Sequence, residues 1–125
     1  MKAVEEVRRI FRNFIKGNRK GYVLTLLSII RLQERGEEAT IENIVKEANS
    51  IIESTRGRID WGVSSYTVDV ATPLLEELVN MGVIEELDGI VTDKLKKKYR
   101  IKDHDGEVER EVYTGLGLVL ASRCC

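Results

Sequence analysis

Residues 20–35 place apolar side chains on nearly every side of a helix, and this pattern constrains the fold more than any other in the sequence. The apolar residues of this stretch are Val23, Leu24, Leu26, Leu27, Ile29, Ile30 and Leu32. A helix of this kind has no long side suited to water, so other elements must surround it. Gly36 predicts its end. A chain of 125 residues is long enough for one core, and we expect a single domain over residues 1–125 with this helix at its centre.

The next predicted helix covers residues 41–53 and begins with a capping signal. Thr40 is a residue type that accepts hydrogen bonds from unpaired N–H groups at a helix start. Asn43 stands three positions later, where a capping box has Glu or Gln. The apolar residues at helical spacing are Ile44, Val45, Ala48, Ile51 and Ile52. A polar loop, residues 54–58, follows this helix.

Residues 1–17 predict an amphipathic N-terminal helix. Its apolar stripe consists of Val4, Val7, Phe11 and Phe14. A stripe this wide must be covered, and two arrangements do so. The helix packs on its own domain, or it packs on the same helix of a second subunit. We favour the second arrangement, which makes the four residues of the stripe the predicted interface of a homodimer.

Residues 64–81 allow two interpretations. In one, a long helix starts near Ser65 and bends at Pro73. In the other, a short helix starts at Pro73 with Thr72 as its N-cap, because a proline inside a helix removes a backbone hydrogen bond and costs about 3 kcal/mol. The apolar residues at helical spacing are Ala71, Leu74, Leu75, Leu78 and Val79. This spacing extends to both sides of Pro73, and we expect the long helix.

A β-hairpin is predicted at residues 97–113. Asp105-Gly106 is a turn signal between two alternating runs, residues 97–102 and 107–113. In this register Lys102 faces Glu109 and Arg100 faces Glu111, and each such pair contributes about 0.2–1 kcal/mol. Tyr99, opposite Val112, would lie on the face that packs on the helices. The fold class predicted from these elements is α+β, mainly α, with a C-terminal hairpin.

Charge is distributed unevenly although the net charge is only −1. Residues 94–102 contain six basic side chains and no acidic one, whereas residues 34–53 and 103–111 are mainly acidic. These segments form a basic surface with an acidic rear, or they are solvated faces that pair with one another; the sequence leaves both open. Charged residues make up 33%, and Gln33 is the sole glutamine, a bias that resembles proteins of hyperthermophiles.

The order of these elements resembles the winged-helix family of DNA-binding domains. The sequence LLEELVNMGVIEE, residues 74–86, resembles the end of the recognition helix and the first wing strand of that family. The sequences KYRI and VYTGLG resemble its wing strands and the start of a final element, as in small archaeal and archaeal-virus regulators. The resemblance covers residues 20–117 and implies a winged-helix core between the N-terminal helix and a tail, residues 118–125.

Members of this family bind double-stranded DNA through the third core helix in the major groove, with the hairpin as a wing beside it. The DNA-binding residues that the resemblance implies here are Arg56, Arg58, Ser64, Ser65, Tyr66, Thr67, Lys96, Lys97, Lys98 and Arg100. We expect the two arginines of the loop and the lysine-rich strand to converge beside the start of that helix. Asp69, Glu76 and Glu77 on the same helix would repel phosphate, which favours an alternative, a winged helix that docks on another protein.

Motifs for catalysis are lacking, so we expect no enzyme, no cofactor and no metal. Trp61 is expected to cover the core at the loop, and His104 to be solvated at the hairpin turn. Two adjacent thiols, Cys124 and Cys125, cannot complete a zinc site with four ligands. A reduced tail and an intersubunit disulfide both remain open for them.

The location predicted from the sequence is the cytoplasm, because the first residues are charged throughout and no long apolar run is present. The leading hypothesis is a homodimeric, sequence-specific regulator of transcription that binds DNA. A winged helix that serves protein–protein contact in a transcription or replication assembly is the alternative.

Overall fold

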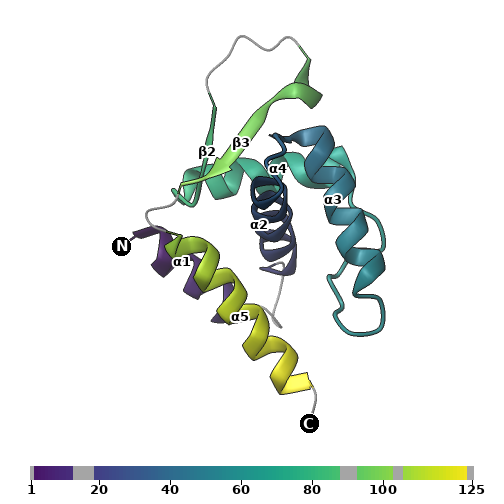
Figure 1. Cartoon of the computed structure of the whole chain (residues 1–125), viewed down its shortest axis with the longest axis vertical. Helices are drawn as coiled ribbons and strands as arrows, with labels where there is room; N and C mark the ends of the chain where they lie inside the picture. The colour runs from purple at the N-terminus through teal and green to yellow at the C-terminus, as the bar shows by residue number, and fades with distance from the viewer. Residues whose placement is uncertain (1, 13–18, 88–92, 103–105, 124–125) are drawn as a thin grey trace.

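The computed structural model describes residues 2–12, 19–87, 93–102 and 106–123, which form five α-helices and a small antiparallel sheet (Figure 1). The chain is therefore mainly helical and of the α+β class. Its elements are α1 (Lys2–Arg12), α2 (Arg19–Glu34), β1 (Ala39–Thr40), α3 (Ile41–Ser54), α4 (Val68–Asn80), β2 (Ile84–Glu86), the 3₁₀ helix η1 (Lys94–Lys96), β3 (Lys98–Ile101) and α5 (Glu107–Arg123).

Helix α2 lies at the centre of the fold, as its apolar pattern predicts. It contacts each of the other four helices and the strands β1 and β3. Even its polar residues Thr25 and Ser28 are fully buried. Their hydroxyls donate to the carbonyls of Gly21 and Leu24, one helical turn earlier, so burial leaves no polar atom unpaired there.

The start of α3 has the predicted capping geometry. Thr40 Oγ1 accepts a hydrogen bond from the Asn43 N–H at 3.1 Å, and Thr40 has extended backbone angles. The Asn43 side-chain amide donates instead to the carbonyl of Glu38 at 2.9 Å. Gly36, with φ +73°, ends the preceding helix as predicted. The predicted bounds of both helices are therefore confirmed to within a residue or two.

The strands form one sheet in the order β1-β3-β2, with β3 in the middle. Ile84 pairs with Ile101 and Glu85 with Arg100, so the hairpin joins β2 to β3. On its other edge, β3 pairs with β1 through Tyr99 and Ala39. The sheet thus combines two strands that follow one another in the sequence, β2 and β3, with the distant strand β1.

The hairpin predicted at residues 97–113 is wrong in its second strand, because residues 107–123 form α5. Val108, Val112 and Leu116 are buried at a spacing of four residues, which a helix satisfies as well as the alternation that suggested a strand. Two glutamates in the first turn also suit a helix N-terminus. The predicted pairs of Lys102 with Glu109 and of Arg100 with Glu111 therefore do not form, and His104 lies outside the described residues.

Helix α1 packs on α5 in the same chain, and the two helices run side by side (Figure 1). Val7 and Ile10 are buried there, with 0% and 1% of their surface exposed. Val4 and Phe11 are partly buried against the same core. Val7 is therefore not available to a second subunit, which corrects the predicted interface at that residue. Phe14 lies outside the described residues.

Helix α4 starts at Val68, with Thr67 as its N-cap, so neither predicted start is right. The Thr67 hydroxyl accepts a hydrogen bond from the Val70 N–H at 3.3 Å. Pro73 lies inside the helix, as the long-helix interpretation predicts. Packing keeps the helix continuous through the proline, because Ala71, Leu75 and Leu78 on both sides of Pro73 are completely buried.

Within the described part of the chain, no helix has the length and apolar character needed to cross a membrane.

Candidate nucleic-acid interface

The loop from Thr55 to Thr67 leads into α4 and presents a short run of exposed hydroxyl groups. Ser64, Ser65 and Thr67 are all exposed, and α4 follows directly. The first turn of a helix of this length offers unpaired N–H groups and a partial positive charge, which suit a phosphate oxygen. The predicted positions of these three side chains at an accessible helix start are therefore compatible with contact to a nucleic-acid backbone.

Tyr66 does not share that surface, and its predicted role as a DNA contact is wrong. Its side chain is only 1% exposed, and its hydroxyl lies 2.6 Å from Thr25 Oγ1 on α2. Its backbone N–H donates to Asn49 Oδ1, and its carbonyl accepts from Asn49 Nδ2, both at 2.8 Å. Tyr66 thus fixes the loop to α2 and α3. Burial raises the pKa of Tyr66 to about 12, and the hydrogen bond with Thr25 opposes part of that rise.

This raised pKa predicts that the free energy of unfolding falls as the pH rises into the alkaline range. The folded chain keeps the phenol proton to a higher pH than the unfolded chain, whose tyrosine has a pKa of about 10. The stabilisation is complete below about pH 10 and is lost as the pH rises toward about 12. Tyr66→Phe should lose about 1 kcal/mol near neutral pH. Urea unfolding at about pH 9 and pH 11 should show a smaller decline for Tyr66→Phe than for the natural chain; equal declines would contradict this assignment.

The lysine-rich segment lies beside the start of α3. The backbone N–H of Ile41 donates to the carbonyl of Lys97 at 3.1 Å, which joins the segment to that helix. Four basic side chains of this segment, residues 94–102, pair with carboxylates of other elements. The pairs are Lys96 with Glu42 and Lys97 with Glu86, both at 3.3 Å, Lys98 with Glu38 at 2.8 Å, and Arg100 with Glu85.

Arg56 and Arg58 lie at the other end of α3. Arg56 pairs with Glu53 at 2.5 Å, and Arg58 donates to the Ser54 carbonyl at 2.7 Å. Along the helix axis, Glu53 is about 17 Å from Glu42, the partner of Lys96. The expected convergence of the two basic groups is therefore wrong, and Figure 1 shows β3 and the loop after α3 at opposite ends of this helix.

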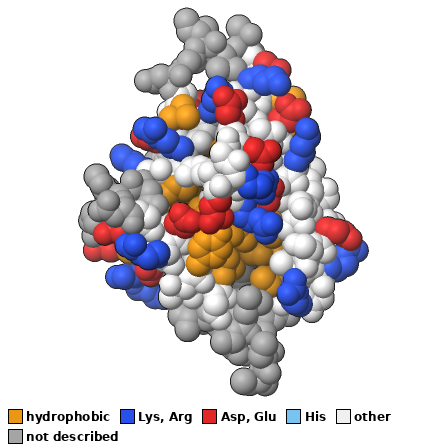
Figure 2. Space-filling model, viewed as in Figure 1, with side chains coloured by type: hydrophobic (Ala, Val, Ile, Leu, Met, Phe, Trp, Pro, Cys, Tyr) orange, Lys and Arg blue, Asp and Glu red, His pale blue; other side chains and the backbone are white. Residues whose placement is uncertain are grey.

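Helix α4 itself carries no Lys or Arg between Val68 and Asn80. Asp69, Glu76 and Glu77 are exposed on it, as the sequence indicates. The face of the molecule in Figure 2 also mixes acidic and basic side chains without one continuous patch of either sign. Any contact of α4 with a phosphate backbone must therefore come from its start.

Trp61 covers the core at the loop, as predicted. It is 3% exposed, and its indole N–H donates to Thr55 Oγ1 at 2.8 Å. Among the described residues, no group of three or more His, Cys, Asp and Glu side chains is arranged to hold a metal ion.

No protein-family model, curated protein or solved structure matches this chain. Function must therefore be argued from the geometry of its own residues.

Proposed function

We propose that this chain is a winged-helix domain that binds double-stranded DNA, as a homodimeric regulator, through its wing and the start of α4. The order of elements from α2 to β3 supports this proposal: helix, short strand, two helices, and a β2–β3 hairpin with β3 paired to the short strand. The observation that carries it is the position of the lysines at the base of the β2–β3 connection, because a wing approaches the phosphate backbone with that connection.

The ion pairs of these lysines do not prevent such a contact. Lys96, Lys97 and Lys98 have side chains that are 61%, 44% and 42% exposed, and their partners are exposed as well. Exposed pairs contribute about 0–1 kcal/mol each, so a phosphate can replace the carboxylate at little cost. Phosphate neutralisation also releases counterions from DNA, which favours binding at low salt.

Charge reversal of the wing lysines tests the proposal. The triple variant Lys96→Glu, Lys97→Glu, Lys98→Glu should weaken binding to duplex DNA by at least about tenfold and reduce the slope of affinity against salt. Fluorescence anisotropy of a labelled duplex at about 50 and 200 mM salt measures both quantities. The same titration gives the number of chains bound per duplex, and one chain per site would contradict the homodimer.

A matched control carries the same change in net charge elsewhere. Arg8→Glu, Arg9→Glu, Arg110→Glu alters exposed residues of α1 and α5, which lie away from η1 and the start of β3 in Figure 1. Circular dichroism checks the fold of both variants. Equal loss of DNA affinity in the two triple variants would exclude a specific role of the wing.

A second candidate function, docking on another protein, is favoured by the acidic outer face of α4. Glu76→Gln with Glu77→Gln removes two negative charges from this face without changing its shape. DNA binding that strengthens in this variant would support the approach of α4 to phosphates. A chain that binds no duplex even at low salt, in natural or variant form, would favour the docking function.

A further inference from the structure

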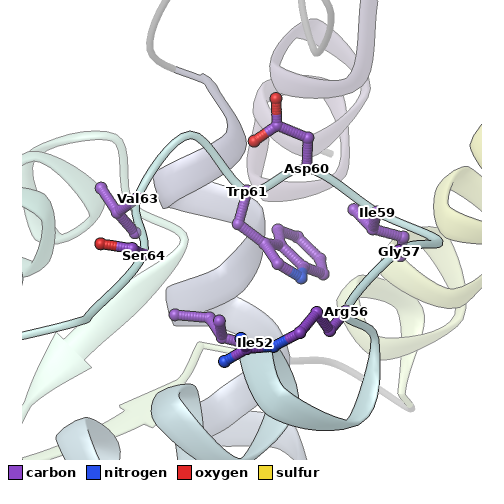
Figure 3. A pocket seen from close by; sticks show the side chains of 8 residues that line it. All are labelled: Ile52, Arg56, Gly57, Ile59, Asp60, Trp61, Val63 and Ser64. Atoms are coloured by element: carbon purple, nitrogen blue, oxygen red, sulfur yellow. The ribbon is translucent and has the colours of Figure 1, made fainter.

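A pocket of about 350 Å³ lies between the C-terminal part of α3 and the loop that leads to α4 (Figure 3). Its volume is in the range of small-molecule sites, near the lower end. The side chains of Ile52, Ile59, Trp61 and Val63 supply apolar surface, and Arg56 and Ser64 supply polar groups. The pocket therefore combines apolar side chains with polar ones, among them the guanidinium of Arg56.

The charges around the pocket favour a negative ligand group. Figure 3 shows the Arg56 side chain extending below the Trp61 ring, whereas the Asp60 carboxylate points away on the opposite side. Asp60 is also engaged elsewhere, since its Oδ1 accepts the Gly62 N–H at 2.9 Å and its Oδ2 lies 3.7 Å from Lys20 Nζ. Arg56 and Asp60 both line the pocket, and Arg56 is the one whose charged side chain extends along the Trp61 ring.

We propose that this pocket binds a small organic carboxylate with an apolar body. The carboxylate pairs with Arg56, and the body lies against Trp61 and the apolar side chains around it. Arg56 forms an ion pair with Glu53, but the side chains of Glu53 and Arg56 are 71% and 72% exposed. A pair this exposed contributes little, so a ligand carboxylate held in the pocket can displace Glu53.

The position of the pocket links it to α4. Ser64 lines the pocket and stands three residues before the N-cap Thr67. A ligand that shifts this loop would therefore also shift the exposed hydroxyl groups at the start of α4. Binding of the carboxylate is independent of the proposed DNA function, whereas an effect on DNA affinity rests on it.

Benzoate is a suitable probe, and its binding can be followed by the fluorescence of Trp61, the sole tryptophan of the chain. Benzoate should change Trp61 fluorescence saturably, and benzyl alcohol, its uncharged analogue, should bind at least about tenfold more weakly. Arg56→Gln should weaken benzoate binding to a similar extent. The matched control is Arg58→Gln in the same loop, which leaves the pocket lining unchanged and should bind as the natural chain does.

Removing the negative charge of Glu53, which competes with the ligand for Arg56, should strengthen benzoate binding instead of weakening it. Glu53→Gln leaves the Arg56 charge without its carboxylate partner and should tighten benzoate binding about threefold. Calorimetric titration gives a second measure of binding. Neither heat nor a fluorescence change, or equal affinities of Arg56→Gln and Arg58→Gln, would overturn the proposed site. If benzoate binds as expected but leaves duplex affinity unchanged, the site stands and only its link to DNA fails.

Discussion

Glu47→Ala is expected to destabilise the fold by about 2–4 kcal/mol, the largest loss that we anticipate for a single charged residue here. The Glu47 side chain on α3 is only 8% exposed and is held by two arginines of the α2 end. Arg31 Nε lies 3.1 Å from one carboxylate oxygen, and Arg35 Nη2 lies 2.5 Å from the other. This contact raises the pKa of Arg35, which Glu37 also approaches. Alanine removes both ion pairs, including the hydrogen bond from Arg35, and leaves a gap between α2 and α3.

Glu53→Ala in the same helix is the matched control for Glu47. Both changes remove a glutamate that pairs with arginine, but the pair of Glu53 with Arg56 is exposed to solvent. We expect a loss below about 0.5 kcal/mol for this control. Urea unfolding of both variants measures the difference. The Glu47 loss should also persist in about 1 M salt, because salt screens buried pairs weakly. Losses of equal size, or loss of the Glu47 effect in high salt, would show that burial does not strengthen this pair.

Local signals in the sequence are sufficient to predict an element where the interactions that fix its bounds lie within a few residues. Thr40 caps α3 through an N–H only three residues away, and Gly36 ends α2 through its own backbone angle. The central position of α2 follows from an apolar pattern that no surface helix could carry. These features were predicted correctly because the interactions that determine them are short in sequence.

Predictions failed where a distant partner decides the outcome. Arg100 can pair with Glu111 in a hairpin or with Glu85 across β2, and charge alone does not distinguish the two. The register is set by which strands meet, and β3 pairs with the preceding strand β2 and the distant strand β1 instead of with the residues that follow it. The spacing of Val108, Val112 and Leu116 could have predicted α5, because apolar residues at four-residue intervals lie on one face of a helix.

At the candidate DNA interface, too, local features were predictable and features set by distant residues were not. Ser64, Ser65 and Thr67 are exposed near a helix start, as expected of polar residues there, although the helix begins at Val68 and not near Ser65. Tyr66 stands between them and yet is buried, because Thr25 and Asn49 from two other helices bind its hydroxyl and backbone. No property of residues 64–67 alone separates the one buried side chain from its exposed neighbours.

Two glycines of α5 provide the second large expected effect. Gly115 is buried, and a Cβ at this position would lie 2.5–2.6 Å from the Cγ, Cδ2 and Cε2 atoms of the Phe11 ring on α1. Real Cβ atoms do not approach ring carbons this closely, so alanine must displace Phe11 from α5. An alanine in place of a helical glycine would otherwise stabilise a helix by about 1 kcal/mol. We expect Gly115→Ala to destabilise the chain by about 1–3 kcal/mol in spite of this gain, because overpacking exceeds it.

Gly117→Ala separates the two contributions, since it lies two residues later in the same helix and an added Cβ meets no atom of the described part of the chain within 4 Å, its own helix backbone aside. This variant should be more stable than the natural chain by about 0.5–1 kcal/mol, through helix propensity and the smaller entropy of the unfolded chain. Phe11→Leu combined with Gly115→Ala should lose less stability than the sum of the single losses, because the shorter side chain removes the clash. Thermal unfolding of the four variants measures this coupling. A fully additive pair would show that α1 does not lie on Gly115, and would return the apolar face of α1 to a partner in another subunit.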